Sequence, residues 1–165
     1  QRQMCIRDSH MTSLVGHLIN GKIVTDADKT QDVFNPSSGE VSKQVALANK
    51  ATVNEAIAAA EKAFVSWRNT PAMKRARVMF KFKDLLEQHS TKICDLIGQE
   101  HGKIAHDAAG ELQRGIENVE YACCAPELLK GEHSKNVAPG IDSWSEMQPL
   151  GVCLLYTSPS PRDED

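Results

Sequence analysis

The stretch Lys103–Gly131, KIAHDAAGELQRGIENVEYACCAPELLKG, indicates how the rest of this 165-residue chain is organised. Its larger apolar residues recur at intervals of four, three and four, which in a helix forms one stripe: Leu112, Ile116, Val119 and Cys123. The spacing predicts one helix over this stretch, or one helix interrupted at Pro126.

The opposite side of the predicted helix is not polar, as it would be on a surface helix. At about 100° per residue it gathers small and apolar residues with one cation and one phenol: Gly110, Arg114, Tyr121, Ala125 and Leu128. A helix that is apolar on both sides needs other parts of the protein to pack against each side. We therefore expect the stretch to come from the middle of a larger protein.

Two more helices are predicted upstream. The first begins at Thr52, where Thr52 and Glu55 have the spacing of a capping box, and Asn69–Pro71 closes it. Its core stripe has helical spacing: Val53, Ile57, Ala60, Phe64 and Trp67. Thr70 is expected to cap the next helix, with Pro71 at its first position.

The next helix is expected to bend near Ser90–Thr91 and to end at Gly102. One side of it is largely apolar: Val78, Phe82, Leu85, Leu86 and His89, then Ile93, Leu96 and Ile97. Its cations spread around the axis, so a solvated surface is expected for them: Lys74, Arg75, Arg77, Lys81 and Lys83.

Strands are predicted near both ends. Asn20–Gly21 between apolar pairs indicates a two-residue hairpin over 17–24, and 32–34 with 41–48 flank a turn over 35–39. The chain after Gly131 is expected to be irregular, with a turn at Pro139–Gly140 and a strand over Ser143–Gln148. The predicted fold is α+β and mainly α: N-terminal β-hairpins, three long helices and a C-terminal strand.

The two ends do not match their surroundings. Residues 1–10 and 153–165 resemble translated adapter or vector sequence, so we expect them to be non-native and 11–152 to be the genuine part. A phosphorylated or proline-motif tail at Thr157–Arg162 is the alternative.

The composition excludes several classes of protein. A formal net charge of −3 and 5% aromatic residues argue against nucleic-acid binding. No apolar run approaches the roughly 20 residues that span a bilayer. The five cysteines have neither zinc nor disulfide spacing, and His101 and His106 do not share a helix face, so no metal site is expected. A reduced, cytoplasmic protein fits best.

Several motifs resemble those of the aldehyde dehydrogenase superfamily. They are NP-x-SGE at 35–40, AF-x-x-W at 63–67, E-x-G-K at 100–103, A-x-GE at 108–111, VEYA at 119–122 and PLGV at 149–152. Within that superfamily, RGIENVE at Arg114–Glu120 is most similar to the methylmalonate-semialdehyde dehydrogenases, which are the CoA-acylating branch. The resemblance covers about Leu14 to Val152.

The resemblance implies that the chain is the N-terminal part of an aldehyde dehydrogenase fold. It implies an NAD- and CoA-dependent enzyme of valine catabolism that oxidises methylmalonate or malonate semialdehyde to propionyl-CoA or acetyl-CoA. It also implies a homo-oligomer assembled through strands such as Ser143–Gln148. The family's nucleophilic cysteine, general-base glutamate and phosphate-binding loop do not occur in this sequence. We therefore expect this chain alone to be inactive and to bind neither cofactor well, and Cys123 and Cys124 to be buried and without a nucleophilic role.

Arg114 is the one candidate site residue. The resemblance implies that it holds the substrate carboxylate, for which a guanidinium offers a planar two-donor fork. Tyr121, seven residues on, is expected to line the same pocket wall. The alternative for Arg114 is an exposed helix residue paired with Glu111 or Glu117. The alternative for the chain is a small helical binding module that docks a partner through the Arg114–Tyr121 face.

Overall fold

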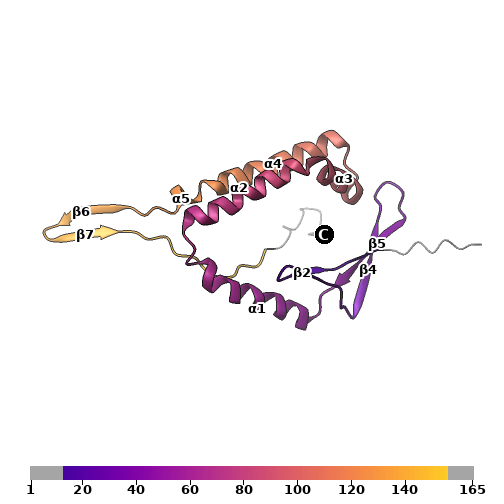
Figure 1. The fold of residues 1–165 in the computed structure, drawn as a ribbon, viewed down its shortest axis with the longest axis horizontal. Coiled ribbons are helices and arrows are strands. Elements are labelled where there is room, and N and C mark those ends of the chain that lie inside the picture. The colour runs from indigo at the N-terminus through magenta and orange to yellow at the C-terminus, as the bar shows by residue number, and fades with distance from the viewer. Residues whose placement is uncertain (1–12, 156–165) are drawn as a thin grey trace, which may run out of the picture.

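The computed structural model describes residues 13–155, in which a small β region precedes four long helices and a terminal hairpin (Figure 1). The strands are β1 (Ser13–Val15), β2 (His17–Ile19), β3 (Lys22–Val24), β4 (Lys29–Phe34), β5 (Val41–Leu47), β6 (His133–Ala138) and β7 (Ile141–Trp144). The helices are α1 (Lys50–Trp67), α2 (Ala72–Gln88), α3 (Ser90–His101), α4 (Ala105–Cys123) and the short α5 (Ala125–Leu128). The predicted α+β class is confirmed. The expected tail 1–10, most of 153–165 and the Thr157–Arg162 motif lie outside the described residues.

Both N-terminal hairpins are present. Asn20 and Gly21 join β2 to β3 with φ of 49° and 74°, the positive values that a type I′ turn requires. β4 and β5 pair antiparallel around the 35–39 turn. β1 was not predicted, and it pairs parallel with β5, so the sheet order is β1-β5-β4. Three residues are too few to give a periodic signal of their own.

The predicted caps of α1 and α2 are wrong. α1 begins two residues before Thr52, and Asn49 is its N-cap: the Asn49 Oδ1 accepts hydrogen bonds of 3.0 Å from both the backbone N and the Oγ1 of Thr52. Asn is among the best N-cap residues, so it displaces the Thr52–Glu55 box. The Thr70 hydroxyl donates to the Ser66 carbonyl instead of capping α2, and Pro71 stands at that N-cap without a side-chain bond.

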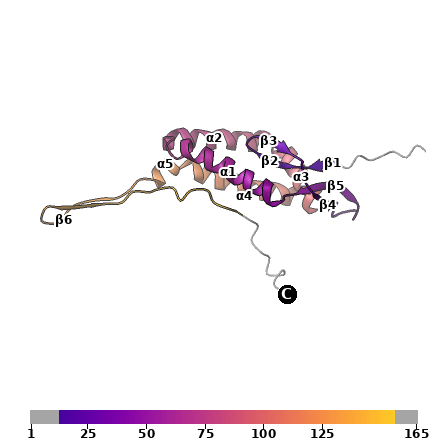
Figure 2. The same ribbon diagram turned by 90° about the horizontal axis from the view of Figure 1, so that it is seen from below.

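The expected break in the second long helix is confirmed at His89, between α2 and α3, and Gly102 ends α3 with φ 73°. α2 and α4 then run side by side (Figures 1 and 2). The face of α4 toward α2 and α3 contains buried Ala108, Ile116 and Cys123, and Ala76 of α2 is buried too. Leu112 and Val119 are half-buried, so the predicted stripe is confirmed as the core side of α4.

The interruption at the end of this stretch falls at Cys124, two residues before the predicted Pro126. Proline has no N–H to donate, so the first turn of a helix accommodates it best, and here it stands in the first turn of α5.

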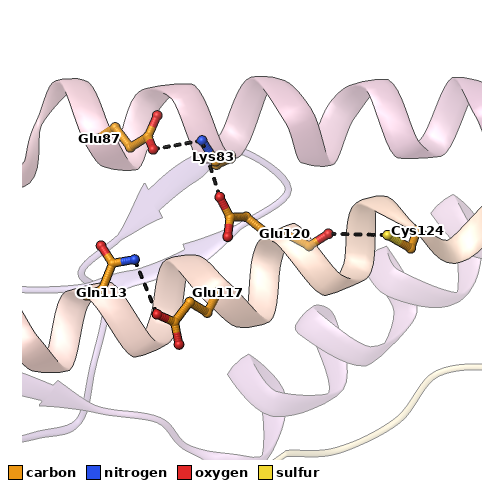
Figure 3. Close-up of polar contacts among 6 residues, drawn as sticks. All are labelled: Lys83, Glu87, Gln113, Glu117, Glu120 and Cys124. Atoms are coloured by element: carbon orange, nitrogen blue, oxygen red, sulfur yellow. Dashed lines mark hydrogen bonds and ion pairs between the residues drawn. The ribbon is translucent and has the colours of Figure 1, made fainter.

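One of the cations on α2 is not simply solvated. The half-buried Lys83 Nζ lies 2.7 Å from Glu87 Oε1 on its own helix and 3.5 Å from Glu120 Oε1 on α4 (Figure 3). These contacts, first the hydrogen bond to Glu87, raise the pKa of Lys83. Arg75 is also half-buried. The prediction of a fully solvated basic surface is therefore wrong for Lys83, against which α4 packs, and for Arg75, whose side chain is partly covered.

The region after Gly131 is more regular than predicted. β6 and β7 form an antiparallel hairpin that extends away from the helices (Figures 1 and 2). Its turn is at Pro139–Gly140, as predicted, but the strand ends at Trp144, so the strand predicted over Ser143–Gln148 is wrong beyond that residue. At the base of the hairpin a Cβ on Gly131 would lie 1.8 Å from the Ser145 carbonyl oxygen, so only glycine fits there.

Within residues 13–155, no helix has the length and apolar character needed to cross a bilayer. The same part of the chain contains no cluster of three or more His, Cys, Asp or Glu side chains that would suit a metal ion.

Candidate functional site

The side of α4 that faces away from α2 and α3 carries Arg114. On this outer face Arg114 and Tyr121 are exposed, with Tyr121 67% accessible, while Gly110 and Ala125 are half-buried. The apolar side chain of Leu128 is exposed at the same end. The outer face that was expected to need cover is therefore only partly covered by the described residues.

Arg114 borders a small cavity at the N-terminal half of α4. The cavity has a volume of about 300 Å³ and is lined by Lys103, His106, Asp107, Gly110 and Arg114. The guanidinium extends back over Gly110: its Nη1 lies 3.7 Å from the position that a Cβ on Gly110 would occupy. Helical side chains generally lean toward the preceding turn, and the missing side chain of Gly110 leaves room for this one.

Tyr121 does not line the cavity with Arg114. Seven residues are about two helical turns, or roughly 10 Å along the axis, and Arg114 leans the other way. The expectation that Arg114 and Tyr121 line one pocket wall is therefore not met in this cavity. Its other basic groups come from the N-terminal side, namely Lys103 and His106.

Glu111 is the nearest acid to Arg114 in the preceding turn, and it already has a partner. The Lys103 Nζ forms a close ion pair with Glu111 Oε2. The hydrogen bond from Lys103 lowers the pKa of the Glu111 carboxyl against the opposing effect of burial, and the charge of Arg114 lowers the pKa further. Glu111 is therefore an anion paired with Lys103.

Glu117, the acid in the following turn, also has another partner. The Gln113 Nε2 donates to Glu117 Oε1 over 3.3 Å (Figure 3). The Arg114 backbone carbonyl accepts from Asn118 Nδ2, but no carboxylate of the described residues forms an ion pair with the guanidinium. The alternative of Arg114 paired with Glu111 or Glu117 is therefore not what the structure shows.

The cysteines lie elsewhere. Cys94, Cys123, Cys124 and Cys153 are free thiols. Cys123 is buried as expected, but Cys124 is exposed at the end of α4, with its Sγ 3.9 Å from the Glu120 carbonyl (Figure 3). The expectation that both are buried is wrong for Cys124, because adjacent helical residues point about 100° apart. None of these four thiols lines the Arg114 cavity.

Sequence reasoning did not identify Lys103 or His106 as site residues. Lys103 was noted only as part of the E-x-G-K motif at 100–103. His106 was considered only as a possible metal ligand. Lys103 precedes α4, and its contact with Glu111 spans eight residues. The regular spacing of helix neighbours at three or four residues gives no signal for such a pair.

Comparison with known proteins places these features in a family. The model of the aldehyde dehydrogenase family matches residues 23–158. Malonate-semialdehyde dehydrogenase of Pseudomonas aeruginosa is 60% identical over 141 residues, which are 86% of this chain and 28% of that protein. Malonate-semialdehyde dehydrogenase 1 of Geobacillus kaustophilus is 44% identical over 147 residues, 88% of this chain and 30% of that protein.

Solved structures agree. The crystal structure of methylmalonate-semialdehyde dehydrogenase from Oceanimonas doudoroffii has a TM-score of 0.81 and 70% identity, covering 85% of this chain and 28% of that one. A Sinorhizobium meliloti 1021 protein assigned to the same enzymes, crystallised with NAD, has a TM-score of 0.82 and 38% identity, covering 86% and 29%. The chain thus spans less than a third of the length of these relatives. Together, the match of the family model and these structures show that the chain belongs to the aldehyde dehydrogenase family.

Proposed function

We propose that this chain forms the N-terminal part of an NAD-dependent, CoA-acylating dehydrogenase of malonate or methylmalonate semialdehyde. The observation that carries the proposal is the 60% identity to the Pseudomonas aeruginosa malonate-semialdehyde dehydrogenase across 86% of this chain. The NAD complex of the Sinorhizobium meliloti relative supports the choice of cofactor. The overall reaction would oxidise the aldehyde through a cysteine thioester, release CO2 and transfer the acyl group to CoA.

The described residues do not fit NAD or CoA by themselves. A cavity of about 300 Å³ lies at the lower end of the range for small-molecule sites and is too small for a dinucleotide. The sequence also has no glycine-rich phosphate loop. The cofactors, the nucleophilic cysteine and the general base would therefore belong to the part of the relatives' length that this chain does not span.

Within this enzyme, Arg114 would hold the carboxylate of the substrate. Its guanidinium borders the cavity and is not engaged by a carboxylate of the described residues. The planar fork of an arginine matches a carboxylate with two parallel hydrogen bonds. The first turns of α4 add a partial positive charge. An anchored carboxylate would orient the aldehyde end and favour semialdehydes over simple aldehydes of similar length.

The complete enzyme would be a homo-oligomer. The β6–β7 hairpin supports this, because it extends from the body (Figure 1). Its apolar side chains Val137, Ile141 and Trp144 are exposed. Apolar edge strands of this kind pair readily with another chain. Light scattering coupled to size exclusion on the full-length protein tests the assembly, and a monomer at micromolar concentration would contradict it.

The activity is tested on the full-length enzyme whose gene encodes this segment. Methylmalonate semialdehyde, NAD and CoA should together yield NADH and propionyl-CoA, and mass spectrometry identifies the thioester. Malonate semialdehyde should yield acetyl-CoA, and omission of CoA should stop thioester formation. NADH formation with the free acid as the sole product would refute the acylating reaction, and no turnover of either semialdehyde would refute the substrate class.

A further inference from the structure

No carboxylate among residues 13–155 forms an ion pair with Arg114, and this needs a physical explanation. Glu111 is three residues before Arg114 and Glu117 three residues after it. Acids at this spacing are neighbours of a helical arginine and normally attract it. An arginine neutralised by its own helix would be a poor ligand for a substrate anion. On α4 both acids are instead held by other side chains, Glu111 by Lys103 and Glu117 by Gln113.

The two pairs differ in strength. Lys103 and Glu111 carry opposite full charges, and the Lys103 side chain is only 28% exposed. Gln113 is neutral, and its bond to Glu117 is long at 3.3 Å. Both bonds have an ionised acceptor, but only the Lys103 pair adds the attraction between two opposite full charges. The Lys103 pair is therefore the one able to keep a carboxylate away from Arg114.

We propose that Lys103 is a positioning residue that holds the Glu111 carboxylate away from Arg114 and so leaves the guanidinium free for the substrate. The inference rests on the proposed role of Arg114. Lys103 comes from the segment between α3 and α4, so it meets Glu111 from the N-terminal side of the cavity. When Lys103 is removed, Glu111 has Arg114 as its nearest cation along the helix, and the acid then competes with the substrate carboxylate.

The test uses the full-length enzyme and the ratio of kcat/KM for methylmalonate semialdehyde to kcat/KM for propanal. Lys103→Met keeps the length of the side chain and removes its charge, and it should lower the ratio about two- to fivefold, as expected for a partly exposed competing ion pair. The loss should fall mainly on KM for the semialdehyde. Lys103→Arg, which preserves the pair, should retain the ratio, whereas a purely structural role of Lys103 would lower kcat/KM for both substrates.

A double-mutant cycle separates the proposal from a general effect of charge. Glu111→Gln alone should change the ratio by less than about twofold, because Glu111 is already held away, but in the Lys103→Met background it should restore most of the loss. The same factor in both backgrounds would show a long-range charge effect and would overturn the proposal. Absence of restoration would show that Lys103 contacts the substrate or supports the fold, and would also overturn it.

Arg114→Ala is assayed beside these variants. If it leaves the ratio at the wild-type value, the proposed function of Arg114 fails, and the role of Lys103 fails with it. If it collapses the ratio while Lys103→Met does not lower it, only the role of Lys103 is overturned. Should Lys103→Met not be recovered as folded protein, Lys103→Leu supports the same cycle, because leucine also lacks both the charge and the donor.

Discussion

The two faces of α4 differ in burial and in the residues that they carry. The inner face contains Ala108 at 0%, Ile116 at 5% and Cys123 at 7% exposure, packed against α2 and α3. The outer face contains Arg114, which has no ion-pair partner in the part of the chain that the structure describes, and a Tyr121 that is two-thirds exposed. The inner face therefore completes its packing within this chain, whereas the outer face carries the candidate chemistry and an apolar surface still to be covered.

α1 also differs from the inner face of α4, because none of its residues is buried. It lies apart from the α2–α4 pair (Figure 1). A mainly apolar hollow of about 630 Å³ lies between α1, the β2–β3 hairpin and residues 152–154. Val53 and Ile57 of the predicted core stripe line it and are nearly half exposed. We expect further protein to cover this surface in the complete enzyme.

The largest expected effect is on activity. If the outer face of α4 is one wall of a site whose other walls this chain does not supply, the purified 165-residue chain should form no NADH from a semialdehyde above a blank. The full-length enzyme at the same concentration is the control. NADH formation by the short chain would contradict the claim that the outer face of α4 is only one wall of an incomplete site.

A second test concerns the inner face alone. Ile116→Ala removes a buried side chain and should destabilise the full-length enzyme by about 2–5 kcal/mol, seen as a lower temperature of half-inactivation. Asn54→Ala, at an exposed position on α1, is the matched control and should stay within about 0.5 kcal/mol of wild type. If the two variants inactivate at the same temperature, burial of Ile116 at the α2–α4 interface does not stabilise the enzyme, and the conclusion that this interface is the core is wrong.

A smaller effect is expected from the outer face in the isolated chain. Exposed apolar surface favours association, so the 165-residue chain should bind ANS and scatter light as a mixture of sizes. Tyr121→Lys combined with Leu128→Lys should reduce both signals in part, whereas Asn54→Lys should not. A monodisperse monomer that melts cooperatively without binding ANS would support the alternative of a self-contained binding module.

Much of the fold could be predicted because its signals are local. The Asn20–Gly21 turn, the stripe of α4 and the stop at Gly102 each depend on a few adjacent residues and hold in the structure. The failures arise where several local solutions compete or where pairing partners are distant. Asn49 takes the cap in place of Thr52 because both residue types are good caps and the two stand only three residues apart. β1 depends on β5, a partner elsewhere in the chain.

The candidate site was predictable in part. The resemblance identified Arg114, and the helical period placed it on the outer face of α4. The period could not show that Arg114 leans toward Gly110 and away from Tyr121, nor that Lys103 reaches Glu111 across eight residues. Both features depend on side-chain direction and on the chain before α4, which residue spacing does not encode.

The most direct test of the account is the substrate preference of Arg114 variants of the full-length enzyme. Arg114→Ala should lower kcat/KM for methylmalonate semialdehyde about tenfold or more, since losing a desolvated charge-assisted pair costs on the order of 2–5 kcal/mol. Arg114→Lys should not restore it, because an ammonium cannot form the two-donor fork. Propanal has no carboxylate, so the preference ratio should collapse. An equal loss on both substrates, or no loss on either, would contradict the assignment of Arg114 as the carboxylate anchor.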